Sequence, residues 1–114
     1  MKKLLCAMLL VPFMASADVN EDLANICNIV KNDDKGELRK KMKTVKQGYG
    51  LTLKDYYSSI SCGGNTLLIH SDKSNSYVVA TLLTKKLPKS LVREEIKKVE
   101  ESSKVYIIMK DRIE

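Results

Sequence analysis

The chain has 114 residues and a formal net charge of +6, with 20 basic residues against 14 acidic ones. This length favours a single domain with a modest core. The chain has no tryptophan, and its only phenylalanine lies in an N-terminal apolar segment, so the composition argues against stacking platforms for nucleic-acid bases and aromatic clamps for sugars.

That N-terminal segment, residues 1–17, has the three parts of a secretory signal peptide. Two lysines open it, residues 4–14 are apolar, and Ala15-Ser16-Ala17 is a small-residue cleavage site. The apolar run is too short for a membrane span, which needs about 20 helical residues. We expect cleavage after Ala17, which removes both lysines, lowers the net charge to +4 and leaves a periplasmic or secreted protein without a membrane span.

Two cysteines, Cys27 and Cys62, remain after the predicted cleavage, because Cys6 lies within the signal segment. An even number of cysteines in a small exported domain favours a disulfide. Closing this loop would stabilise the fold by roughly 4 kcal/mol. The alternative, two buried free thiols, stays open because the pairing rests on compartment and count alone.

In the first half of the mature chain, the spacing of apolar residues predicts two antiparallel helices. Apolar residues at helical spacing favour a helix over 18–31 with Asn20 as its cap, and they place Cys27 on its buried side. A second helix is predicted over 35–46, where Asp34 and Glu37 make a capping-box-like start. Gly48 is its expected stop signal.

A short third helix is predicted over 53–59, with Thr52 and Asp55 as a capping pair. A strand stays open there, because tyrosine and isoleucine also favour strands. Gly63-Gly64 then predicts a tight turn after Cys62.

Thr66 is expected to cap another short helix, followed by a polar turn over 72–76. Periodicity alone allows a helix or a buried strand for the apolar segment 77–86. An internal similarity favours the helix: a shift of 41 positions aligns Ile26-Cys27 with Leu67-Leu68, and also Leu38 with Val79 and Met42 with Leu83. Such a repeat predicts two stacked helix pairs.

Pro88 suits the first turn of a last helix that is predicted to run to Ser102. Residues 105–109 form a strand-like run, which we expect to dock on the helices or to stay loosely ordered. The fold class is therefore mainly α, with stacked helix-turn-helix pairs and a possible short C-terminal strand. The predicted division is a disulfide-stapled helical domain over 18–86 and a C-terminal helix and tail over 87–114.

The segment 64–71, followed by Ser74-Asn75-Ser76 and the run 78–83, resembles an ankyrin repeat. It has the turn, the Thr-capped short helix and the longer Val/Leu-rich helix of that family. Leu67, Ile69 and Ser71 stand where the family has proline, histidine and alanine. The resemblance implies helix-turn-helix geometry.

The N-terminal part of the mature chain, about residues 18–83, is also similar to a family of small exported bacterial proteins described only as a domain of unknown function. The similarity is carried by Cys27-Asn28-Ile29-Val30, the 35–42 helix, Tyr57, and Cys62-Gly63-Gly64-Asn65 with the three residues after it. This resemblance implies no particular activity.

Two groups of basic residues are the candidate binding residues, and they are Arg39, Lys40, Lys43, Lys85, Lys86, Lys89 and Arg93. Together they could form a surface for acidic proteins, lipopolysaccharide or phospholipid head groups. A solvated helix face is the plain alternative. Membrane-surface helices usually carry exposed large apolar residues beside their lysines, whereas the apolar residues here are needed for the core.

No spacing marks a catalytic centre. His70 is the only histidine, and it follows an apolar run, where a packing or hydrogen-bonding role is ordinary. Cysteines that form a disulfide cannot act as nucleophiles. No zinc-ligand spacing is present, and Gly63-Gly64-Asn65-Thr66 lacks the lysine of a phosphate loop. We therefore predict no catalytic residue, no metal and no cofactor.

The resulting hypothesis is a non-catalytic interaction or accessory module of the bacterial cell envelope. Its expected partner is an envelope protein, with weak contact to anionic surfaces and no nucleic acid. The alternative is a periplasmic inhibitor or immunity protein that acts against an enzyme of the cell wall or membrane. An enzyme with an unrecognised site is a third alternative.

Overall fold

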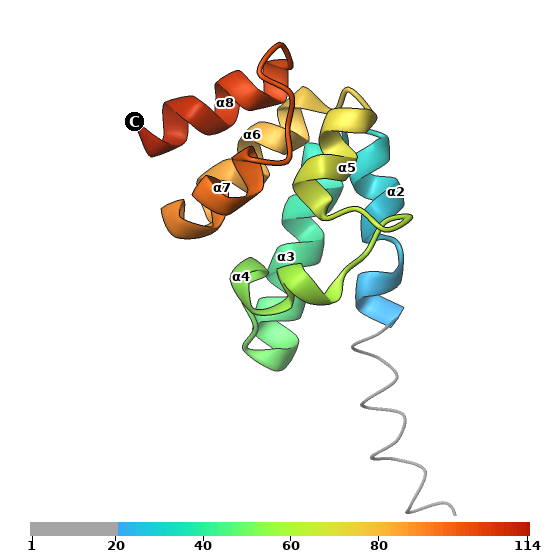
Figure 1. Ribbon diagram of the computed structural model, residues 1–114. Helices are drawn as coiled ribbons and strands as arrows, with labels where there is room; N and C mark the ends of the chain where they lie inside the picture. Colours follow the sequence, from blue (N-terminus) through green and yellow to red (C-terminus); the bar gives the residue numbers. More distant parts are fainter. Residues whose placement is uncertain (1–20) are drawn as a thin grey trace, which may run out of the picture.

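The computed structural model describes residues 21–114 as a bundle of short helices (Figure 1). The predicted signal segment 1–17 and the Asn20 cap lie outside these residues. The elements in chain order are α2 (Ile26–Lys31), α3 (Lys35–Tyr49), α4 (Leu53–Tyr56), the 3-10 turn η1 (Tyr57–Ser59), α5 (Leu67–Lys73), α6 (Tyr77–Lys86), α7 (Lys89–Ile96) and α8 (Lys104–Ile113). Residues 21–114 contain no strand, and the mainly α prediction is confirmed.

The predicted repeat of two helix pairs is confirmed. In both pairs the linker turns through one residue with positive φ, Asp33 at 55° and Asn75 at 57°. The residue after each one donates its backbone N–H to a carbonyl five positions earlier, from Asp34 to Ile29 at 3.1 Å and from Ser76 to Ser71 at 2.8 Å. The α2–α3 and α5–α6 pairs stack, with α2 against α5 and α3 against α6.

The N-terminus of α6 is capped by the neighbouring helix pair. The Ser76 side chain forms no cap bond; its Oγ donates instead to the Lys31 carbonyl at 3.2 Å. Asp33 takes over this role, because its Oδ1 accepts from the backbone N–H of Val79 at 2.8 Å. The loop of the first pair therefore satisfies an N–H group that helix geometry leaves without an intrahelical partner.

The predicted strand at the C-terminus is wrong, because this segment forms α8. Ser103 caps it: its Oγ accepts from the N–H groups of Val105 and Tyr106 and donates to Asp72 Oδ1 at 2.6 Å. Val105 and Met109, one helical turn apart, are fully buried. This burial against α6 and α7 outweighs the strand preference of the β-branched residues.

Arg112 holds the other end of α8 on α6. Its Nε and Nη2 donate to the carbonyl oxygens of Thr84 and Leu87, at 3.1 and 3.3 Å. These groups lie in the last turn of α6 and at its C-cap, where carbonyls lack helical partners. Figure 1 shows α7 and α8 beside α6, while α4 lies near the C-terminal end of α3.

Three predicted helix boundaries are also wrong. The helix predicted over 18–31 is interrupted at Asn25, between the helical residues 21–24 and α2. Helix α3 continues through Gly48 to Tyr49, and its C-cap is Gly50, where φ is 70°. The last predicted helix stops at Ile96 instead of Ser102. In α3, the left-handed conformation at Gly50, which glycine adopts without strain, provides the stop.

Candidate binding groove between α3 and α6

The disulfide prediction fits the fold, because the Sγ atoms of Cys27 and Cys62 lie at disulfide distance, 2.06 Å apart. The chain turns after Cys62 through Gly63 and Gly64, whose φ angles are 62° and 89°. Ser61 Oγ accepts from the Gly64 N–H at 3.1 Å. The N–H of the second glycine is therefore used within the turn itself.

His70 lies beside the first cysteine. Its Nε2 is 3.0 Å from the carbonyl oxygen of Cys27. A carbonyl oxygen only accepts hydrogen bonds, so Nε2 is the protonated nitrogen in this contact. His70 therefore ties α5 to α2.

A row of basic residues runs along one side of α3. The helix starts at Asp34, whose Oδ1 accepts from the Glu37 N–H at 3.1 Å. Lys35, Arg39 and Lys43 then follow at intervals of four residues, and Lys46 three residues later. Residues at these spacings lie on the same helix face.

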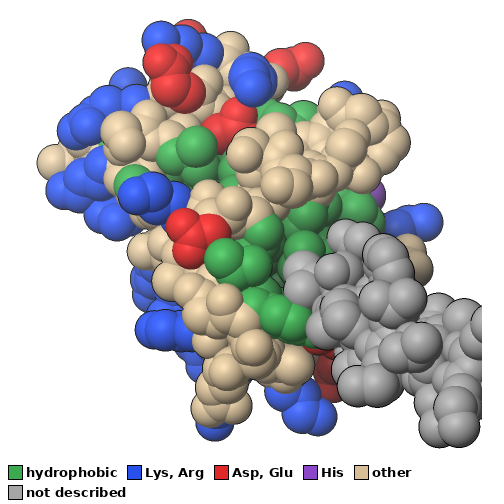
Figure 2. Space-filling model, turned by 90° about the horizontal axis from the view of Figure 1, so that it is seen from below, with side chains coloured by type: hydrophobic (Ala, Val, Ile, Leu, Met, Phe, Trp, Pro, Cys, Tyr) green, Lys and Arg blue, Asp and Glu red, His purple; other side chains and the backbone are tan. Residues whose placement is uncertain are grey.

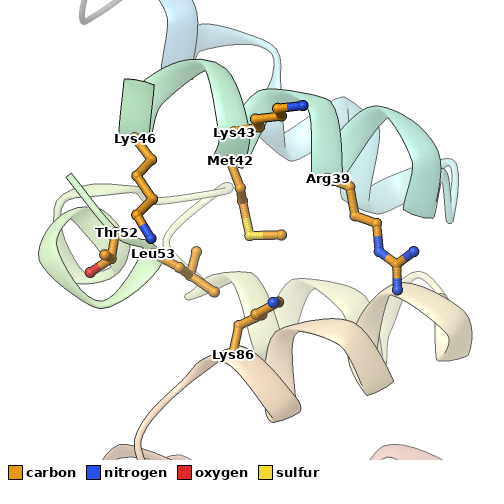
Figure 3. Close-up of a pocket in the computed structure, with 7 residues that line it drawn as sticks. All are labelled: Arg39, Met42, Lys43, Lys46, Thr52, Leu53 and Lys86. Carbon is orange, nitrogen blue, oxygen red and sulfur yellow. The ribbon is translucent and has the colours of Figure 1, made fainter. Parts of the chain in front are cut away.

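This row forms one wall of a groove whose other wall is α6. A cavity of about 430 Å³ is lined by Arg39, Met42, Lys43, Lys46, Thr52, Leu53 and Lys86. In Figure 3 the Met42 side chain points from α3 toward Lys86 of α6, and the Lys46 side chain turns toward Thr52 and Leu53. The cavity therefore has an apolar floor and a basic rim.

A second cavity, of about 200 Å³, adjoins the first and shares Arg39 with it. It is lined by Lys35, Arg39, Val78, Thr81, Leu82 and Lys85. The first cavity is bounded by later residues of both helices and the second by earlier ones, so the two lie in series along the groove. We call the two cavities together the α3–α6 groove.

The charge of the α3–α6 groove is uniformly positive. Its lining contains six basic side chains, all exposed, and no acidic one. None of the six forms an ion pair with a carboxylate of residues 21–114. On the face in Figure 2, Lys and Arg side chains gather along one flank and apolar side chains occupy the middle.

The structure brings four of the predicted binding residues together and leaves three apart. Arg39, Lys43, Lys85 and Lys86 line the groove. Lys40 does not, and its Nζ lies 3.8 Å from Glu37 Oε1. Lys89 and Arg93 are exposed on α7 and are not part of the lining.

Sequence reasoning missed Lys35 as a groove residue, although its spacing from Arg39 and Lys43 places the three on one face of α3. Lys46, at the end of the same basic run, also lines the groove. Sequence reasoning also missed the apolar floor. Met42 packs against the core, as its place among the apolar residues of the helix predicts, but no pattern in the sequence indicated that it also lines a cavity with Leu53.

Asp55 is the acidic residue of the capping box beside Thr52. Its Oδ2 accepts from Thr52 N–H at 2.8 Å and from Thr52 Oγ1 at 3.0 Å. These hydrogen bonds hold the pKa of the Asp55 carboxyl below its usual value. The predicted capping pair is confirmed, and Asp55 stays ionised at neutral pH.

A buried polar cluster lies at a different place, between η1, α5 and α7. The Tyr57 hydroxyl donates to Glu95 and accepts from the Leu68 N–H at 3.1 Å. Burial opposes ionisation of Glu95, but hydrogen bonds from Tyr57, Thr66 and Lys98 outweigh it and lower the pKa of the carboxyl. Burial of the Tyr57 hydroxyl, together with its hydrogen bond to Glu95, raises the pKa of Tyr57.

Residues 21–114 contain no group of three or more His, Cys, Asp or Glu side chains arranged to hold a metal ion. Among the helices described, none combines the length and the apolar character needed to cross a membrane.

The comparisons with known proteins give one match. No curated protein and no solved structure matches the chain. The model of a family described as protein of unknown function (DUF3718) matches residues 26–93. This range includes the cysteine pair, both stacked helix pairs and every residue that lines the α3–α6 groove, and it covers more than half of the chain. The chain therefore belongs to the DUF3718 family.

Proposed function

We propose that this protein is a non-catalytic binding module of the bacterial cell envelope that holds an anionic partner in the α3–α6 groove. The observation that carries this proposal is the set of six basic side chains that line the groove without an acidic neighbour in its lining. Like charges four residues apart on a helix repel each other. A partner that brings carboxylates or other anions would relieve this repulsion and gain charge-assisted hydrogen bonds.

The proposed compartment rests on two features of the chain. Residues 1–17 have the pattern of a cleavable secretory signal, and Cys27 and Cys62 lie at disulfide distance. Structural disulfides persist in oxidising compartments such as the bacterial periplasm. Both features support an exported protein.

The proposal of binding without catalysis rests on how the reactive side chains are engaged. The two cysteine sulfurs face each other, and His70 bonds to a backbone carbonyl. The groove lining contains basic, apolar and hydroxyl side chains, and lysine and arginine recognise anions through charge and donated hydrogen bonds.

The test is capture of partners from an envelope fraction by the purified mature protein. The variant Arg39→Glu/Lys86→Glu reverses two charges on opposite walls of the groove. Its matched control, Lys40→Glu/Lys97→Glu, changes the net charge equally at exposed lysines outside the lining. We expect a partner that the wild type and the control retain and the groove variant loses. Equal capture by all three proteins would contradict the proposal.

A further inference from the structure

The proposed function leaves open which kind of anion fits the groove. Resting on it, we propose that the partner is an acidic segment of another protein, which places a large apolar side chain between Met42 and Leu53 and carboxylates on the surrounding basic residues. Met42 would then determine specificity.

The apolar floor is the first reason. Leu53 is 4% exposed and belongs to the core, and Met42 is partly buried against that core. Both face a cavity of about 430 Å³, which is within the range of ligand pockets in proteins. A small inorganic anion would use the basic rim and leave the apolar floor in contact with water.

The second cavity repeats the same arrangement. Val78 is 49% exposed and lies with Leu82 among Lys35, Arg39 and Lys85. Because Arg39 lines both cavities, a carboxylate bound to it would lie between two apolar positions. A peptide that alternates acidic and apolar side chains matches this order of charges and apolar surface.

The placement of the apolar groups favours a protein segment over a lipid bilayer. A membrane-bound helix inserts protruding apolar side chains. Among the described residues, the large apolar side chains that are exposed are Val78 on α6 and Ile107 on α8, and the Met42–Leu53 floor is recessed beneath lysine and arginine. The cavity over Met42 and Leu53 therefore receives a side chain instead of inserting one.

The absence of aromatic residues from the lining separates an acidic peptide from single-stranded nucleic acid. Proteins that bind single strands combine basic grooves with aromatic side chains on which bases stack. The two cavities are lined by basic, aliphatic and hydroxyl-bearing residues.

The experiment measures binding of two labelled peptides to the mature protein by fluorescence anisotropy at low salt. One peptide has leucines between glutamates, and the other has serines in place of the leucines. We expect the leucine peptide to bind at least about tenfold more tightly, because its leucine leaves water on binding. Arg39→Glu/Lys86→Glu should weaken both peptides, and Lys40→Glu/Lys97→Glu should weaken neither.

Three variants test the role of Met42. Met42→Gln keeps the side-chain length but makes the floor polar, so it should remove the preference for the leucine peptide over the serine peptide. Met42→Leu, which keeps the floor apolar, should retain the preference. Thr44→Gln, at an exposed position of α3 outside the lining, should behave as wild type.

The outcomes separate this inference from the proposed function. Equal affinity for the two peptides, with loss in the Arg39→Glu/Lys86→Glu variant, would overturn the apolar anchor while the anionic groove stands. Unchanged affinity of the Arg39→Glu/Lys86→Glu variant for both peptides would overturn the apolar anchor and the anionic groove together. Vesicles of phosphatidylglycerol that bind more tightly than the leucine peptide, through the same two residues, would replace the protein segment by an anionic lipid surface.

Discussion

The Tyr57 hydroxyl donates a 2.5 Å hydrogen bond to Glu95 Oε1, although the two residues lie 38 positions apart in the chain. Glu95 is only 3% exposed, and its other oxygen, Oε2, lies 3.0 Å from Lys98 Nζ. The Tyr57 hydroxyl also accepts from the Leu68 N–H at 3.1 Å. One phenol therefore connects η1 with the first turn of α5 and with α7.

Tyr57→Phe should destabilise the fold by about 2 kcal/mol, because it removes one bond to a buried carboxylate and one to a buried N–H. Tyr56→Phe is the matched control. The Tyr56 hydroxyl is buried without a hydrogen-bond partner among the described residues, so its removal should be neutral or slightly stabilising. Urea unfolding of both variants measures the difference. Equal stability of the two variants would show that the Tyr57 bonds contribute nothing.

Stability should fall as the solution is acidified. The pKa of Glu95 is lower in the folded protein than its ordinary value of 4.5, so the unfolded chain binds a proton more readily. The contribution of Glu95 is therefore complete above pH 4.5 and is lost as the pH falls through the folded-state value. Asp55, whose pKa is also lowered, acts in the same direction.

Glu95→Gln tests the source of this acid sensitivity. The variant should be less stable at neutral pH, and its unfolding free energy should depend less on pH below 4.5 than that of the wild type. Unfolding curves at a series of pH values give both quantities. If the pH dependence of the unfolding free energy is unchanged in Glu95→Gln, other carboxyl groups are its source.

The contact between the two helix pairs should be sensitive to Asp33, whose φ is 55° and whose carboxylate caps α6. Asp33→Asn keeps an acceptor and tolerates this conformation, so it should be nearly neutral. Asp33→Gly tolerates the conformation but loses the hydrogen bond to the Val79 N–H, which should cost about 1 kcal/mol. Asp33→Ala loses the cap and adds backbone strain of about 1 kcal/mol more. Thermal unfolding should rank the three in this order, and an Asp33→Asn variant as unstable as Asp33→Gly would contradict the capping role.

Replacement of both Cys27 and Cys62 by serine should destabilise the mature protein by about 4 kcal/mol, because the unfolded chain gains the entropy of an open loop. Reduction of the wild type should have a similar effect. The mass of the intact protein without reductant should also be lower by two hydrogens than that of the reduced form. Free thiols on both cysteines of the native protein would refute the disulfide and weaken the case for export.

The helix pairs could be predicted because their signals are local. The shift that aligns Ile26 with Leu67 marks the first residue of α2 and of α5, and Leu38 and Val79 are both fully buried. The capping residues Asp34, Asp55 and Thr66 lie within three positions of the groups that they satisfy.

The features that escaped prediction depend on tertiary contacts. Residues 105–109 have strand propensity, and the packing of α8 on α6 and α7 makes them helical. The Asp33 cap on Val79 and the Tyr57–Glu95 bond join positions far apart in the sequence. The groove arises only when α3 and α6 stack, so the basic residues of each helix could be found from the sequence but their common cavity could not.

The most direct test of the α3–α6 groove is the affinity of the mature protein for a labelled poly-glutamate peptide, measured by fluorescence anisotropy with increasing salt. We predict that the affinity weakens with salt, falls about tenfold or more in Arg39→Glu/Lys86→Glu, and stays within about twofold of wild type in Lys40→Glu/Lys97→Glu. Equal loss of affinity in the two variants would mean that net charge alone attracts the peptide, and it would contradict a binding site in this groove.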